Sequence, residues 1–247
     1  MAKRAEYHMR HYGVWSALKK RDSAIRVALA ALTGYLTGTF PTADIVTRYA
    51  ASRDGHDTTD LRSAGTGNPG ALNAAKVLGW KWGALVLAGD AAKGALASVA
   101  GRMLAGDSGA YAAGSAAVMG HCAPIWSGFR GGKGLATSAG TALACFPAYM
   151  PVDLALAAGT LALSRGRAGT ATYVASAIFI AAAAYWWRAK KGNLWGPKPT
   201  AGLPLYAISS SAIIAYRFLS APSPSLESPV GAGTEKEYAE PESAVVS

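Results

Sequence analysis

Long apolar stretches separated by short polar ones dominate the first 220 residues of the chain. Several stretches approach the ~20 residues that a helix needs to cross a bilayer. Others are shorter, which fits tilted or broken helices around an internal cavity. The pattern therefore predicts an all-α, polytopic integral membrane protein with about seven transmembrane helices, over residues 26–49, 82–104, 109–126, 134–147, 148–165, 171–187 and 201–219.

The two ends of the chain depart from this pattern. Residues 1–25 mix basic and aromatic side chains, which fits either a basic arm or an amphipathic helix on the membrane surface. Residues 220–247 are rich in Pro, Ser, Gly and Glu, a composition typical of a disordered tail. We therefore expect an N-terminal arm, one transmembrane domain over residues 26–219, and an acidic tail.

Composition supports a membrane protein with an anionic partner. Charged residues make up 15% of the chain, against about 25% in soluble domains. The net charge of +10 indicates anionic lipid or an anionic substrate. The basic residues flank apolar stretches instead of forming one soluble module, which argues against nucleic acid. Neither the two cysteines nor the four scattered histidines have metal-ligand spacing, so we expect no metal.

Two glycine-rich stretches interrupt the apolar pattern, "AGTGNPGALNAAKVLG" at residues 64–79 and "GFRGGKG" at residues 128–134. Glycine lets the backbone approach an oxyanion closely, and a following helix offers unpaired N–H groups at its N-terminus. The two loops could hold one phosphate each or two ends of one ligand. The alternative is a pair of tight interfacial turns with snorkelling cations. Their polar side chains are Thr66, Asn68, Asn73, Lys76, Arg130, Lys133 and, just beyond, Thr137.

Two better-known phosphate motifs are excluded. Gly65, Gly67 and Gly70 have the G-x-G-x-x-G spacing of dinucleotide-binding folds, but no apolar strand precedes them and no βαβ unit surrounds them. The "GFRGGKG" stretch is one residue short of a Walker A loop, and no Ser or Thr follows Lys133.

Four stretches together resemble one enzyme family, the bacterial acyl-phosphate-dependent glycerol-3-phosphate acyltransferases (PlsY). They are "GYLTGTFPTADIVTRY", "AGTGNPGALNAAKVLG", "GDAAKG" and "GHCAPIWSGFRGGKGLATSAG", in the family's order and at similar separations over residues 34–141. The resemblance implies a seven-helix enzyme of the bacterial cell membrane. Such an enzyme moves an acyl chain from acyl phosphate to the position-1 hydroxyl of glycerol 3-phosphate, giving lysophosphatidic acid for phospholipid synthesis. It uses no metal or other cofactor, and its partners are its two substrates and membrane lipids.

The resemblance also implies roles for individual residues. Acyl phosphate is already activated, so catalysis needs positioning and charge stabilisation and no nucleophilic triad. Lys133, Thr66 and His121 are the catalytic candidates, although the place of His121 in "GHCAP" equally fits a structural hydrogen-bonding role. The substrate-binding candidates are Thr39, Arg48, Gly65, Gly67, Asn68, Gly70, Asn73, Lys76, Asp90, Lys93, Arg130, Gly131, Gly132, Gly134, Thr137, Arg167, Thr170 and Arg217.

Asp90 and Lys93 form a separate charged group within an apolar stretch. They are three residues apart, so on a helix they share a face and are expected to pair. We expect this pair to support the structure or to orient the substrate.

Departures from the family pattern leave alternatives open. Lys76 stands where the family has Arg, which keeps the charge but loses bidentate geometry. The run "YRFLSAPSP" keeps Arg217 but lacks the family's His and Asn in its last helix. A diverged, inactive membrane protein that binds a phosphorylated lipid or polyol is therefore the alternative. A transporter is a second alternative, but the sequence shows no inverted repeat, which argues against it.

The tail generates a prediction. Removing the chain from Ser223 onward should leave folding unchanged, because a Pro-, Ser- and Glu-rich segment buries too little apolar surface to stabilise a fold. The detergent-extracted yield and the melting temperature of the truncated and full-length chains provide the measurement. A collapse of either on truncation would contradict the prediction.

Overall fold

The computed structural model describes residues 21, 23–55, 59–163 and 168–220, and every regular element in these ranges is helical. The expected all-α class is confirmed for this part of the chain. Most of the expected N-terminal arm and nearly all of the expected tail lie outside the described residues. The elements are a helix over residues 23–38, α2 (Thr42–Asp54), α3 (Ala71–Leu78), α4 (Trp80–Cys122), η1 (Ile125–Ser127), α5 (Leu135–Cys145), η2 (Pro147–Tyr149), α6 (Met150–Leu163), α7 (Ala168–Arg188) and α8 (Gly202–Ser220).

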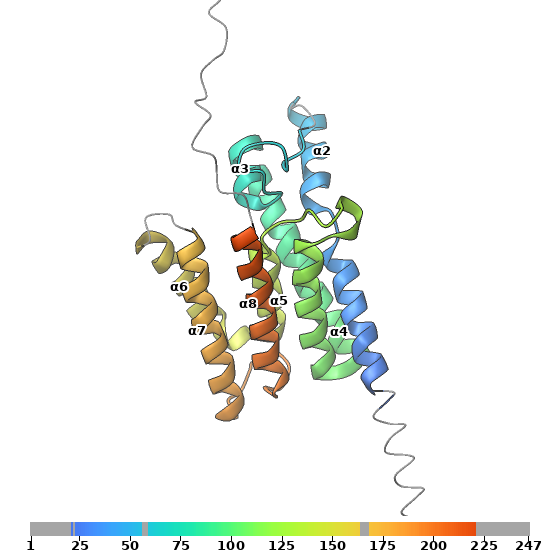
Figure 1. Ribbon diagram of the computed structural model, residues 1–247, viewed down its shortest axis with the longest axis vertical. Coiled ribbons are helices and arrows are strands. Elements are labelled where there is room, and N and C mark those ends of the chain that lie inside the picture. Colours follow the sequence, from blue (N-terminus) through green and yellow to red (C-terminus); the bar gives the residue numbers. More distant parts are fainter. Residues whose placement is uncertain (1–20, 22, 56–58, 164–167, 221–247) are drawn as a thin grey trace, which may run out of the picture.

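The long helices run roughly side by side, and α4 lies between the helix over residues 23–38 and the pair α5 and α8 (Figure 1). α4 packs against α2, α3, α5 and α8. The short helix α3 and the helix α2 lie together at one end of the bundle, where the segment between α4 and α5 also lies (Figure 1). We call this the loop end of the molecule. Both glycine-rich stretches are at the loop end.

Two breaks divide the long helical stretches, one within an expected span and one between two expected spans. The expected span over residues 26–49 is two helices, because Pro41 has no N–H group and restricts the residue before it. α4 in turn contains two expected spans, joined at the non-helical residues Ala105 and Gly106. Gly106 has a positive φ of 64°, which glycine adopts without steric cost. The two halves of α4 fold back on each other at this point.

The expectation of about seven transmembrane helices is not confirmed. Among the described residues, three helical segments are long and apolar enough to cross a membrane: Trp80–Ser127, Gly169–Arg188 and Gly202–Ser220. A fourth is added if Leu135–Cys145 and Pro147–Leu156, bent by 111°, form one broken span. α5 and α6 are only 11 and 14 residues long, so neither meets the length of a full span alone.

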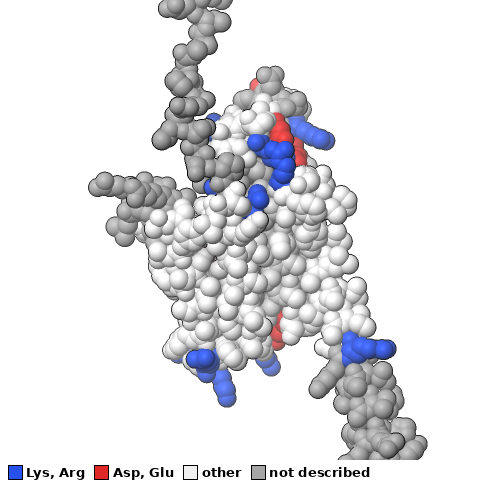
Figure 2. Space-filling model, in the orientation of Figure 1, with Lys and Arg blue, Asp and Glu red and all other residues white. Residues whose placement is uncertain are grey.

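The surface nevertheless has the form expected of a protein in a bilayer. Lys, Arg, Asp and Glu gather at the two ends of the molecule, and a broad band between them carries almost none (Figure 2). Large apolar side chains on the helices, such as Leu29, Leu32, Leu96 and Leu154, are more than half exposed. An exposed apolar band flanked by charge fits a surface that faces lipid.

Small residues let the helices approach closely. A Cβ atom on Gly34 or Gly38 would collide with the backbone of Ala113 or Ala117 in α4. A Cβ on Gly140 in α5 would likewise meet the carbonyl of Ala91. Helices in membranes associate through such close contacts, because lipid provides no hydrophobic driving force between them. This packing holds the helices that carry the polar residues of the loop end.

The close contact predicts a measurable cost for one added methyl group. Gly140→Ala should lower the free energy of unfolding by about 1–3 kcal/mol, because the backbone of α4 cannot move aside freely. Gly159→Ala is the matched control, since nothing lies within 4 Å of its Cβ position in α6. Thermal unfolding in detergent should show a lower midpoint for Gly140→Ala alone. Equal midpoints for the two variants would contradict the packing argument.

Candidate functional site

A cleft of about 170 Å³ opens at the loop end. Its walls come from the end of the helix over residues 23–38, the start of α2, Arg62 and Pro69 between α2 and α3, both halves of α4 and the segment before α5. Of the residues expected to act in the site, those that line the cleft are Thr39, Asp90, Lys93, His121, Gly131 and Gly132.

A buried charged cluster forms the floor of the cleft. Lys93 Nζ lies 2.8 Å from Asp90 Oδ1, so the expected pair is confirmed. His121 Nδ1, from the other half of α4, lies 3.5 Å from the same oxygen. Lys93 also donates a hydrogen bond of 3.0 Å to the carbonyl of Phe40, at the break before α2. The cluster thus ties both halves of α4 to the N-terminal break, while Asp90 Oδ2 has no hydrogen-bond partner among the described residues.

The second glycine stretch is folded tightly over His121. A Cβ on Gly131 would meet the carbonyl of His121, and one on Gly132 would meet its Nε2 atom, so only glycine fits at either position. The Gly132 N–H group donates a 3.2 Å hydrogen bond to the His121 carbonyl. Gly134, with φ of 86°, then starts α5. His121 therefore lies directly beneath the loop that carries Lys133.

Arg217 of α8 holds the same loop from the other side. Its Nη2 atom donates to the carbonyl of Gly131 at 2.7 Å, and its Nε atom donates to that of Gly132 at 3.2 Å. Lys133 Nζ lies 4.5 Å from the ring centre of Phe218, the next residue of α8. Two cations, Lys133 and Arg217, are therefore brought to one place near the start of α5.

The electrostatics of these two cations favour an anion. Among the described residues, no carboxylate forms an ion pair with either of them. Burial and the nearby charge of Arg217 lower the pKa of Lys133 below its usual value. A phosphate bound there would offset the repulsion between the two cations and would accept charge-assisted hydrogen bonds from Lys133.

The first glycine stretch is held in shape by Asn73 of α3. The Asn73 Nδ2 atom donates to the carbonyls of Leu61 and Ala64, at 3.0 and 2.9 Å. Its Oδ1 atom accepts the backbone N–H of Thr66 at 2.7 Å. Gly65 and Gly67 take positive φ values of 59° and 69° in the turn. Asn73 was expected to bind substrate, but the structure commits its amide to folding this loop.

The remaining expected residues lie outside the cleft. Thr66, Gly65, Gly67, Asn68 and Gly70 form the first loop beside it, where only Pro69 reaches its wall. Thr137 is fully buried in the first turn of α5, and its hydroxyl has no hydrogen-bond partner among the described residues. Arg167 lies outside the described residues. The expected residues that are exposed to solvent or lipid are Arg48, Lys76, Arg130 and Thr170.

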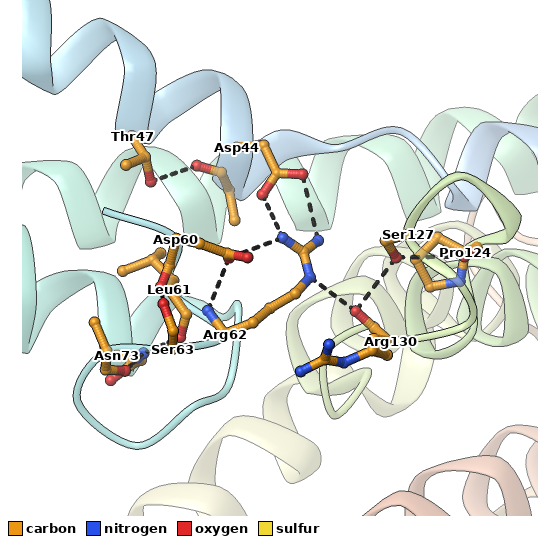
Figure 3. A network of polar contacts seen from close by, with 12 residues as sticks. Asp44, Thr47, Asp60, Leu61, Arg62, Ser63, Asn73, Pro124, Ser127 and Arg130 are labelled. Atoms are coloured by element: carbon orange, nitrogen blue, oxygen red, sulfur yellow. Dashed lines mark hydrogen bonds and ion pairs between the residues drawn. The ribbon is translucent and has the colours of Figure 1, made fainter. Parts of the chain in front are cut away.

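One residue that sequence reasoning missed is Arg62, which lies between the two glycine loops (Figure 3). Its Nη1 and Nη2 atoms donate to the two carboxylate oxygens of Asp44 at 2.7 and 3.3 Å. Its Nε atom donates to the carbonyl of Arg130 at 2.9 Å. Burial raises the pKa of the Asp60 carboxyl, but hydrogen bonds from Arg62 outweigh this and hold that pKa below its usual value. The signal available in the sequence was the Asp60-x-Arg62 spacing beside the first loop.

Comparisons with known proteins agree on one family. A family model described as glycerol-3-phosphate acyltransferase matches residues 28–223. A curated protein of that name from Thermoanaerobacter pseudethanolicus is 39% identical over 137 residues, which are 56% of this chain and 66% of that protein. One from Bacillus subtilis is 41% identical over 117 residues, 47% of this chain and 58% of that protein. In both alignments the chain spans less than two thirds of the relative's length.

Solved structures resemble the fold as well. The crystal structure of PlsY (YgiH), an integral membrane glycerol 3-phosphate acyltransferase, in its glycerol 3-phosphate form has a TM-score of 0.63 and 27% identity. The match covers 78% of this chain and 88% of that chain. The lysophosphatidic acid form of the same protein gives a TM-score of 0.61. This likeness, with the apolar helices, places the present chain in a membrane.

The lowered pKa of Lys133 leads to a prediction on its reactivity. Only the neutral amine reacts with an amine-directed reagent, so labelling of Lys133 should begin at a lower pH than labelling of a free lysine side chain. Arg217→Gln removes the repulsive charge and should shift the labelling curve to higher pH. Mass spectrometry of the labelled peptide gives the measurement. Identical curves with and without the Arg217 charge would show that the two cations do not interact.

Proposed function

The chain belongs to the glycerol-3-phosphate acyltransferase family, and from this premise we propose that it transfers a fatty acyl group from acyl phosphate to the position-1 hydroxyl of glycerol 3-phosphate. The product is lysophosphatidic acid, which remains in the membrane for phospholipid synthesis. We place the reaction at the loop end of a multi-pass protein of the bacterial cell membrane. The shorter helices α5 and α6, with the helix over residues 23–38, complete a bundle of seven membrane-embedded segments.

The observation that carries this proposal is the pair Lys133 and Arg217, which lie together without a carboxylate partner among the described residues. Both substrates carry phosphate, and a phosphate is the anion that such a pair accommodates. The glycine loop also brings this pair to the N-terminus of α5, where free N–H groups and the helix dipole favour negative charge. A long acyl chain can remain among the apolar helices while its phosphate reaches the loop.

The proposed chemistry is a direct acyl transfer. The acceptor hydroxyl oxygen forms a bond to the acyl carbon, and the bond from that carbon to the phosphate oxygen breaks. The hydroxyl proton leaves with the released phosphate, so no protein base is required. Negative charge grows on the departing phosphate as the bond breaks, and Lys133 stabilises that charge more strongly than it stabilises the ground state. His121 orients the loop from beneath, through its contacts with Gly131 and Gly132.

The first glycine loop would bind the other phosphate. In the turn around Thr66, the N–H groups of Thr66, Gly67 and Gly70 already donate within the loop. The exposed hydroxyl of Thr66 and the exposed side chain of Lys76 are the groups proposed to meet the phosphate. Thr66, Asn68 and Lys76 are therefore proposed to hold one substrate phosphate while Lys133 and Arg217 hold the other. Positioning the two substrates next to each other supplies much of the rate enhancement that an activated acyl donor needs.

Lys133→Ala tests this assignment. Removal of one charge-stabilising contact typically costs on the order of 2–4 kcal/mol, so turnover should fall roughly a hundredfold or more. Lys133→Arg should rescue poorly, because the planar guanidinium does not fit a site shaped for a compact ammonium group. The measurement is turnover with palmitoyl phosphate and glycerol 3-phosphate at saturating concentrations. Both the lysophosphatidate formed and the phosphate released are quantified.

Lys198→Ala is the control, because Lys198 is exposed in the segment between α7 and α8, at the end opposite the cleft. It should keep wild-type turnover, and all three variants should keep the wild-type melting temperature. If Lys133→Ala keeps more than about a tenth of the turnover, the loss is well below that of a removed transition-state contact, and the role given to this loop is wrong. A wild-type protein that binds glycerol 3-phosphate but forms no product would support the inactive alternative.

A further inference from the structure

We infer that Arg62 is a positioning residue that fixes the distance between the two glycine loops, and so sets how the two substrates meet. The inference rests on the proposed function, because it assigns one substrate phosphate to each loop. Arg62 lines the cleft, but its guanidinium already donates to Asp44, Asp60 and the Arg130 carbonyl, so it is not proposed to touch either substrate. Its effect passes through the backbone of the loop that carries Lys133.

The contacts of Arg62 join three separate parts of the chain (Figure 3). Asp44 belongs to the first turn of α2, Asp60 precedes the first glycine loop, and Arg130 lies within the second. The Arg62 backbone N–H also donates to Asp60 Oδ1 at 2.9 Å, which fixes the start of its own loop. Arg130 is followed directly in the chain by Gly131, Gly132 and Lys133. A shift of Arg62 would therefore move one loop against the other.

Only an arginine can make this set of contacts. The guanidinium is planar and presents its donors in a rigid fork, so it can bind both oxygens of Asp44 while Nε faces the carbonyl of Arg130. The Arg62 side chain is only 15% exposed, which limits competition from water. A lysine would keep the charge but could not span Asp44 and the Arg130 carbonyl together. Arg62→Lys therefore distinguishes a role that depends on the shape of the guanidinium from one that depends only on its charge.

The consequence for catalysis follows from the separate attachment of the two loops. The first loop is folded by Asn73, and the second by His121 and Arg217, so each keeps its own shape when Arg62 changes. Each phosphate should then still bind, and the Michaelis constants should change little. The relative placement of the substrates would be lost, and a displacement of about 1 Å can lower a rate by roughly 100-fold.

Arg62→Lys tests the inference in the full-length protein. We expect kcat to fall roughly 10- to 100-fold. The KM of each substrate should stay within about threefold of the wild-type value, because each loop still binds its phosphate. Arg53→Lys is the matched control, because Arg53 is an exposed arginine in the last turn of α2. Asp44→Asn should lower kcat in the same direction, and combining it with Arg62→Lys should add little further loss.

Hydrogen–deuterium exchange reports on the contact independently of activity. In Arg62→Lys the peptides covering residues 59–70 and 127–134 should exchange faster than in wild type and in Arg53→Lys, because a link between the loops is gone. Unchanged exchange in both peptides would overturn the inference even if the wild-type protein proves inactive. Faster exchange with unchanged kcat in an active protein would overturn the positioning role. If Arg62→Lys has a lower melting temperature but a wild-type kcat per folded molecule, Arg62 only stabilises the fold.

Discussion

The hydrogen bonds from Arg217 to the carbonyls of Gly131 and Gly132 are the contacts on which the rest of the site depends. They fix the backbone of the loop at two glycines, which have no side chains of their own to hold it. They also bring a second positive charge close to Lys133, in a setting where burial already disfavours the charged lysine. Such an arrangement is costly without an anion and favourable with one. These contacts support our proposal that the loop binds phosphate, with its stability and its chemistry resting on the same hydrogen bonds.

α4 provides the frame that makes this arrangement possible. Its two halves fold back at Ala105 and Gly106, and this turn brings His121 to within 3.5 Å of Asp90. His121 then packs directly beneath Gly131 and Gly132, where no larger residue would fit. The buried Lys93 uses the same carboxylate and reaches the break at Phe40. A buried charged cluster thus connects the break after the N-terminal helix, both halves of α4 and the second glycine loop.

The sequence predicted the helical class, the Asp90–Lys93 pair and the two glycine loops, because each depends on residues that are close together in the chain. Glycines and a lysine in an apolar chain are costly unless they have a use, so their pattern favours a binding loop over a simple interfacial turn. The role of Arg62 could not be recognised in this way, because its partners Asp44 and Arg130 lie 18 and 68 residues away. The commitment of Asn73 to the fold was also hidden, since only the turn geometry shows where its amide points. The expected segments 134–147 and 148–165 also divide where the structure bends, at Phe146 and Pro147, and α5 and α6 are only a few residues shorter than expected.

The central claim is that Lys133 binds the phosphate of the acyl donor. The most direct measurement is an experimental structure of the protein with a non-hydrolysable acyl phosphonate, which has the charge and the acyl chain of the donor. The account predicts phosphonate oxygens within hydrogen-bond distance of Lys133 Nζ, about 2.7–3.2 Å, with the acyl chain extending among the helices. A phosphonate bound in the cleft at Lys93, with Lys133 making no contact to it, would contradict the account.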